Sequence, residues 1–247
     1  QFKQLANLDI TKEPMEVGPT THYVMGGVRV DAETQMSTVS GLFATGEVAA
    51  GLHGANRLGG NSLSDLLVFG KRAGEYAAKF AQENEGGEID DAEVDALAKA
   101  ALEPLERDGD GENPYEIQRE LQEMMQDKVG IIREDGLMRE AIDDIAKLAE
   151  RAPKAAAPGN REYNPGWHTA LDLKCLLTVS EASARAALER RESRGAQTRN
   201  DFPDKDPDDW GQHNLLLRKG SDGAMEVEKV PVVPQTEQQK KIIKDNQ

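Results

Sequence analysis

The sequence has 247 residues, enough for one large domain or two smaller ones, and its formal net charge is −15. Such acidity argues against nucleic acid as a partner, because phosphate binding needs clustered lysine and arginine. No apolar run approaches the roughly 20 residues that cross a bilayer, so we expect no direct membrane span. Residues 83–112 hold twelve acidic residues against Lys99 and Arg107. This segment is typical of a solvated surface, with an acidic docking surface as the alternative.

The first 82 residues have the pattern of an α/β domain. Residues 22–31 alternate apolar and polar side chains around a double glycine, which predicts a strand or hairpin. Residues 41–46 predict a short buried strand that leads into a turn. Residues 51–61 are too rich in glycine for regular structure.

A helix is expected to begin directly after this glycine-rich loop. Asn61 or Ser62 can cap it, with Asp65 near the third helical position. The small and apolar residues of the helix recur at helical spacing and predict close packing against a sheet. They are Leu63, Leu66, Leu67, Gly70, Ala73, Gly74 and Ala77.

Beyond a Gly- and Glu-rich linker at 83–89, the sequence predicts helices near 90–106, 114–128, 135–151 and 168–192. Apolar stripes on the last three favour a bundle core over cofactor contacts. The stripes are Leu121, Met124, Met125 and Val129; Leu137, Ala141, Ile145 and Leu148; and Ala170, Leu173, Leu177, Ala184 and Leu188.

The remaining segments are less regular. Residues 153–166 predict a loop and residues 199–213 a series of turns. Residues 224–233 alternate like a strand, which Pro231 limits to an edge or end position, and the polar tail from Gln235 is expected to fray. The single cysteine, Cys175, stands among leucines and is expected to be a buried structural thiol.

Two glycine-flanked groups could do chemistry: Thr20-Thr21-His22 and His53-Gly-Ala-Asn-Arg57. Arginine binds a carboxylate through a planar fork and keeps its charge, and histidine adds a donor. Together they could hold both ends of a small dicarboxylate. The alternative is a capped loop with a satisfied histidine. The helix start after Asn61 favours negative charge, which would suit a reduced flavin.

Long motifs carry a resemblance to a known family. The stretches PTTHYVMGGVRVD and GLFATGEVAAGLHGANRLGGNSLSDLLVFGKRAG are similar to succinate dehydrogenase, fumarate reductase and L-aspartate oxidase flavoproteins. The stretch RRESRGAQTRNDFPDKDPDDW resembles the ESRGAHxRxDFPxRDDxxW pattern of the same enzymes. Gln197 replaces the usual histidine of that pattern, and Lys205 and Pro207 also depart from it. The matching motifs run from about Pro14 to Trp210.

The resemblance implies three structural parts. Residues 1–82 would be an α/β portion of an FAD-binding, Rossmann-like domain. Residues 83–198 would be an all-α helical bundle domain, and residues 199–247 an extended tail with room for a β-strand.

The resemblance also implies site residues. His22 and Arg57 would bind the substrate carboxylates, Glu47 would contact the ribose of FAD, and Ser62 and Leu63 would contact the flavin. The proton-transferring arginine is expected upstream, so no catalytic residue is expected in this fragment.

Other positions keep two interpretations. His53 could be structural or near the substrate, and Arg194 could anchor a salt-bridge network or bind substrate. Asn56 and Asn61 lie in the same motif with no role assigned.

The implied function is that of a succinate dehydrogenase flavoprotein subunit, which transfers hydride between succinate or fumarate and FAD. Electrons would pass to an iron–sulfur subunit, and membrane anchor subunits would hold the protein peripherally at the cytoplasmic face of the inner membrane. The fragment alone is expected to be inactive. The alternatives are an L-aspartate oxidase of the same fold and a non-catalytic helical module that docks other subunits.

Overall fold

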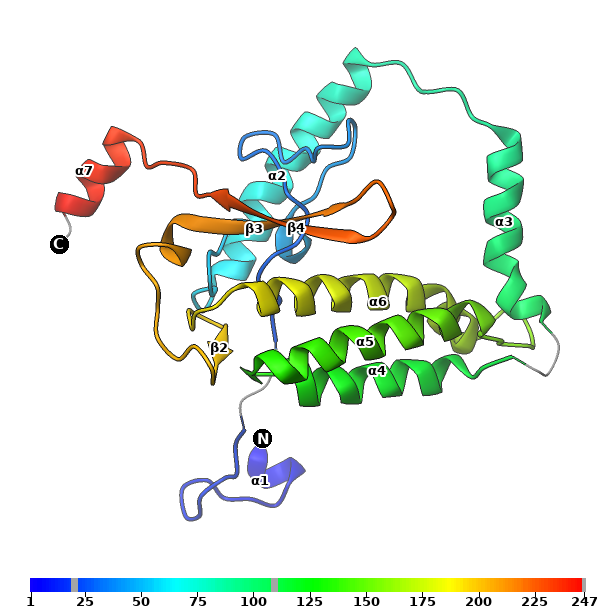
Figure 1. The fold of residues 1–247 in the computed structure, drawn as a ribbon, viewed down its shortest axis with the longest axis horizontal. Helices are drawn as coiled ribbons and strands as arrows, with labels where there is room; N and C mark the ends of the chain where they lie inside the picture. The colour runs from blue at the N-terminus through cyan, green and yellow to red at the C-terminus, as the bar shows by residue number, and fades with distance from the viewer. Residues whose placement is uncertain (19–21, 108–110, 246–247) are drawn as a thin grey trace. The chain divides into compact units, whose positions relative to one another are not determined.

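The computed structural model describes residues 1–18, 22–107 and 111–245 (Figure 1). They form two compact units, Gln1–Asn84 and Glu85–Gln247. The division into three parts at 82 and 198 stays a prediction. Within the described ranges, no helix combines the length and the apolar character that a bilayer crossing requires.

The first unit consists of loops and one long helix. It contains the short helix α1 (Phe2–Leu5), the 3-10 turn η1 (Gly46–Val48) and the helix α2 (Asn61–Glu83). Isolated bridges take the place of the strands predicted at 22–31 and 41–46, because glycines with positive φ interrupt the extended backbone. The bridges pair Val28 with Ala49, Val30 with Ser37, and Met36 with Phe43.

Helix α2 begins at Asn61, within two residues of the predicted start, but neither Asn61 nor Ser62 is its cap. The N-cap residue is Gly60, in the left-handed region with φ of 83°, and it has no side chain that could accept a hydrogen bond. Asp65 is not a capping residue, since neither of its carboxylate oxygens accepts a hydrogen bond within the described residues, and it is buried, with 4% of its surface exposed.

The predicted apolar face of α2 is also wrong in its first two turns. The exposed fractions are 70% for Leu63, 50% for Leu66 and 76% for Leu67, whereas Ala73 is buried. The helical period explains this result, because the buried side of α2 follows Asp65 and Ala73, eight residues apart and hence near one face.

The second unit is built on four helices: α3 (Asp91–Glu106), α4 (Pro114–Val129), α5 (Asp135–Arg151) and α6 (Pro165–Glu189). They confirm the predicted helices. Figure 1 shows α4, α5 and α6 side by side. Their starts follow local chemistry, with asparagine N-caps and proline in the first turn of α4 and α6. Asn113 accepts a hydrogen bond from the Tyr115 amide, and Asn164 from the Trp167 amide.

The core of this unit lies between α4, α5 and α6 and confirms most of the predicted stripes. Its most buried side chains are Ile117, Leu121, Val129, Met138, Ala141, Ile145, Leu148, Leu173, Leu177, Ala184 and Ala187. In α5, Met138 takes the core position predicted for Leu137, which is 38% exposed, because spacings of three and four residues run from Met138 to Leu148.

Cys175 is exposed rather than buried. It lies two residues from both Leu173 and Leu177, which face the core. Two helical residues turn by about 200°, so the thiol points to the opposite side of α6.

Short elements complete the second unit. The strands β1 (Ile132–Arg133) and β2 (Thr198–Arg199) pair in parallel, and β3 (His213–Lys219) pairs antiparallel with β4 (Met225–Pro231). The predicted strand is thus confirmed, with Pro231 at its end, whereas its partner β3 was not predicted. The tail contains helix α7 (Glu237–Asp245), so the expectation of a frayed tail was wrong. The 3-10 turns are η2 (Ala152–Lys154) and η3 (Trp210–Gln212).

Candidate functional site

The candidate site of the first unit rests on two loops joined at a glycine. The Val28 amide donates to the Val48 carbonyl over 2.7 Å. Gly27 has a φ of 141°, and a Cβ there would lie only 2.2 Å from the Val48 carbonyl oxygen. This close approach requires glycine. It fixes the turn that carries Glu47 beside the segment that follows His22.

Glu47 helps to hold these loops together. Its Oε1 accepts a hydrogen bond from the Val24 amide over 3.0 Å, and the residue is exposed. The contact with the ribose of FAD predicted for Glu47 remains a prediction.

Arg57 lies against an aromatic ring. Its guanidinium carbon is 4.7 Å from the centre of the Tyr23 ring, a distance at which a cation is attracted to the ring face. The Nε atom of Arg57 is buried and has no hydrogen-bond partner among the described residues. A buried donor without an acceptor is unusual in a folded protein, so the described residues leave the hydrogen-bonding capacity of Arg57 incompletely used.

His22 is exposed and directly precedes Tyr23. The two predicted substrate ligands therefore come from loops that meet through the contact between Tyr23 and Arg57. Thr20 and Thr21, the other members of the predicted group, lie outside the described residues.

The His53 ring packs against the Tyr23 ring. The ring centres of the two residues are 5.4 Å apart, and the rings meet edge to face at 83°. His53 Nε2 is 3.4 Å from Asp65 Oδ2, and the side chains are 12% and 3% exposed. The ring therefore connects Tyr23 to a buried carboxylate.

The pKa of Tyr23 reflects this surrounding. Burial raises it most, the negative charges of Asp65 and Glu47 raise it further, and Arg57 opposes them. The phenol is therefore protonated at neutral pH and presents a neutral ring to Arg57.

The start of α2 fits an anionic group such as a reduced flavin. Amides in the first turn of a helix point out of its end, and the helix dipole favours negative charge there. An added Cβ at Gly59 or Gly60 would meet nothing within 4 Å in the described parts of the chain, so a ligand can approach the backbone. Ser62 is half-buried and Leu63 is exposed beside this opening.

Sequence reasoning did not assign Tyr23 or Asp65 to this site. Asp65 fitted a capping pattern, and Tyr23 had no motif of its own. Only the folded loops bring these residues together with His53 and Arg57.

Residues 118–243 match the family model for the fumarate reductase flavoprotein C-terminus, and residues 1–63 match one for an FAD binding domain. The chain belongs to the succinate dehydrogenase and fumarate reductase flavoprotein family.

Relatives in this flavoprotein family cover most of the chain. A fumarate reductase flavoprotein subunit of Haemophilus influenzae is 40% identical over 225 residues, which are 89% of this chain and 37% of that protein. A succinate dehydrogenase flavoprotein subunit of Coxiella burnetii is 39% identical over 232 residues, 88% of this chain and 39% of that protein. The Mycobacterium smegmatis Sdh1 complex in the apo form superposes with a TM-score of 0.85 at 46% identity, covering 96% of this chain and 40% of that one. The chain thus spans well under half the length of these relatives.

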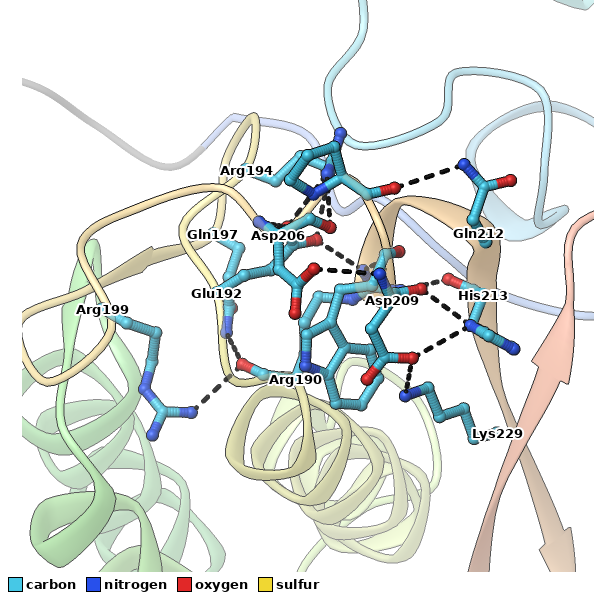
Figure 2. A network of polar contacts seen from close by, with 12 residues as sticks. Arg190, Glu192, Arg194, Gln197, Arg199, Asp206, Asp209, Gln212, His213 and Lys229 are labelled. Atoms are coloured by element: carbon cyan, nitrogen blue, oxygen red, sulfur yellow. Dashed lines mark hydrogen bonds and ion pairs between the residues drawn. The ribbon is translucent and has the colours of Figure 1, made fainter.

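The part that matches the flavoprotein C-terminus contains a dense polar network (Figure 2). Its centre is Glu192, which is fully buried. Arg194 donates to both oxygens of Glu192, over 2.7 and 3.0 Å, and Arg190 donates to Oε1 over 2.8 Å. These contacts confirm that Arg194 anchors a salt-bridge network.

The network also fastens the β-hairpin of β3 and β4. Arg190 donates to the carbonyl oxygens of Trp210 and His213, and its guanidinium carbon lies 5.1 Å from the centre of the Trp210 ring. Lys229 of β4 stands over the same ring at 4.0 Å and pairs with Asp209.

Gln197, one of the residues that depart from the family pattern, links β1 to the end of α6. Its Nε2 donates to the carbonyl oxygens of Ala187 and Arg190 over 3.0 and 3.2 Å. Its Oε1 accepts a hydrogen bond from Arg133. The amide thus uses both its donor and its acceptor end.

Proposed function

We propose that this chain is part of the flavoprotein subunit of a succinate:quinone oxidoreductase, which interconverts succinate and fumarate. The observation that carries the proposal is the state of Arg57. Its guanidinium packs on Tyr23, while its buried Nε lacks a hydrogen-bond partner among the described residues. A substrate carboxylate would pair with the charge that arginine keeps at any physiological pH.

The remaining site residues take supporting roles. His22 binds the second carboxylate, so that the two ends of the four-carbon substrate are held by two loops. Glu47 contacts the ribose of FAD, and Ser62 and Leu63 contact the flavin at the start of α2. The first unit is then a portion of an α/β, Rossmann-like FAD-binding domain. Bound FAD supplies the two-electron redox chemistry.

The substrate ligands contribute orientation and charge. Fixing both carboxylates of the dicarboxylate removes rotational freedom before the reaction. The positive charge of Arg57 withdraws electron density from the bound substrate. The arginine that transfers a proton lies outside this chain.

The proposed partners are an iron–sulfur subunit, which receives the electrons, and membrane anchor subunits. These subunits would hold the flavoprotein peripherally at the cytoplasmic face of the inner membrane. The names of the relatives support this assignment over L-aspartate oxidase and over a non-catalytic docking module, since they are fumarate reductase and succinate dehydrogenase subunits.

The test is Arg57→Ala in the whole flavoprotein, assayed with succinate and, separately, with L-aspartate. We expect wild-type turnover with succinate only, and a variant that binds flavin but has lost turnover, because a buried charged contact contributes roughly 2–5 kcal/mol. Arg119→Ala is the matched control, since Arg119 is 64% exposed and pairs with Glu123 on α4. Near-normal turnover in Arg57→Ala would overturn the proposal.

A further inference from the structure

The contacts around Arg57 form a continuous series. The guanidinium rests on one face of Tyr23, His53 meets Tyr23 edge to face, and Asp65 lies 3.4 Å from His53. All four residues belong to the first unit. Each contact joins one member of the series to the next.

Asp65 is the least expected member of this series. It is 4% exposed, and neither of its carboxylate oxygens has a hydrogen-bond partner within the described residues. His53 Nε2 also lacks a hydrogen bond there, although it stands at ion-pairing distance from Asp65. Burying a carboxylate with so few partners is unfavourable. An apolar side chain at this position would stabilise the fold more, so stability alone does not explain an aspartate.

We propose that Tyr23, His53 and Asp65 are positioning residues that hold the Arg57 guanidinium in the orientation required for binding a substrate carboxylate. This inference rests on the proposed function of Arg57. Asp65 attracts and orients the His53 ring, the edge-to-face contact between the two rings fixes Tyr23, and the Tyr23 face fixes the plane of the guanidinium. None of the three residues needs to touch the substrate.

The arrangement explains why the arginine can be both oriented and available. A direct salt bridge to a carboxylate would hold Arg57 equally well, but it would occupy the donors that the substrate needs. An aromatic face attracts the cation without accepting its N–H groups. Two rings, those of His53 and Tyr23, thereby separate the buried carboxylate from Arg57.

The first test measures the KM for succinate, kcat, flavin content and the Kd for malonate, a non-reactive dicarboxylate, in the whole flavoprotein. We expect Asp65→Asn and Tyr23→Leu to raise both KM and Kd about five- to tenfold while flavin stays bound, as loss of an aromatic–cation contact would. Tyr23→Phe keeps the ring and should recover most of the affinity lost in Tyr23→Leu. Glu75→Gln is the matched control, because Glu75 lies on α2 with a 63% exposed side chain.

Equal affinity losses in Tyr23→Phe and Tyr23→Leu would overturn the positioning role. Unchanged KM and Kd in Asp65→Asn would do so as well.

The second test is a double-mutant cycle between Asp65→Asn and Arg57→Lys. If Asp65 acts through Arg57, Asp65→Asn should change the Kd for malonate less than about twofold once the guanidinium is gone. A full additional loss in the double variant would show that Asp65 acts independently and would overturn the inference.

The two proposals fail in different ways. Full turnover in Arg57→Ala would remove the proposed function and the positioning role with it. An inactive Arg57→Ala together with normal Asp65→Asn and Tyr23→Leu would remove the positioning role alone.

Discussion

Arg199 and Asp201 form a two-pronged ion pair in the second unit. Arg199 Nε donates to Asp201 Oδ1 and Nη2 donates to Oδ2, each over 2.7 Å. The arginine side chain is fully buried, and the aspartate side chain is 24% exposed. Arg199 also donates to the Ala187 carbonyl at the end of α6. The pair therefore joins the segment after β2 to the helical core.

Because of this ion pair, we expect the stability of the fold to fall at acid pH. The hydrogen bond from Arg199 lowers the pKa of Asp201 from 3.8 to about 2. Since the folded pKa lies below the unfolded one, the stabilisation is complete above the unfolded value and is lost as the pH falls towards the folded value. We expect Asp201→Asn to lower the urea midpoint of this chain at neutral pH and to flatten its decline between about pH 4 and pH 2. Asp172→Asn, an exposed residue of α6, should leave the decline unchanged. A mutant curve parallel to that of the wild type would contradict the assignment.

We expect replacement of Glu192 to lower the free energy of unfolding more than replacement of Asp201 does. Replacing it by glutamine or alanine leaves Arg190 and Arg194 without the carboxylate that both contact. Breaking a buried ion pair from one side costs about 3–5 kcal/mol. Urea unfolding followed by tryptophan fluorescence, to which Trp210 beside Arg190 contributes, would measure the loss. Glu123→Gln removes an acid that is 62% exposed and should change stability by less than about 1 kcal/mol. Similar small changes in both variants would argue against the role of the network.

Gly27 and Gly26 offer a matched pair of substitutions. Both have positive φ, 141° and 122°, but an added Cβ would strike the Val48 carbonyl only at Gly27 and would meet nothing within 4 Å at Gly26. Gly26→Ala should therefore cost only backbone strain, about 1–3 kcal/mol. Gly27→Ala should in addition separate the loops that carry Glu47 and His22, and lower the flavin content of the whole protein. Equal flavin content in the two variants would show that this close approach is not required.

The helices of the second unit could be predicted because their signals are local. The apolar stripe of α4, with Leu121 and Val129, and the proline at the start of α4 lie within one segment of sequence. The errors there concern position around the helix axis, such as Met138 in place of Leu137 and the exposed Cys175. Strand β3 was missed because its pairing with β4 depends on residues six to eighteen positions away.

The candidate site was predictable only in part. The family motifs pointed to His22 and Arg57, and the structure places their loops in contact through Tyr23. The buried Asp65 gave no sign in the sequence, because its spacing matched a helix cap. Contacts between residues distant in the chain, such as Tyr23 with His53, follow from the loop geometry alone.

The hydrogen bonds by which Gln197 joins β1 to the end of α6 do not depend on pH. A carboxamide keeps the same donors and acceptor across the whole range in which an imidazole gains or loses its charge. The connection of Arg133 with the end of α6 should thus persist unchanged when the surroundings acidify. A histidine at this point would instead gain a positive charge in acid, beside the guanidinium of Arg133, and the two charges would repel each other.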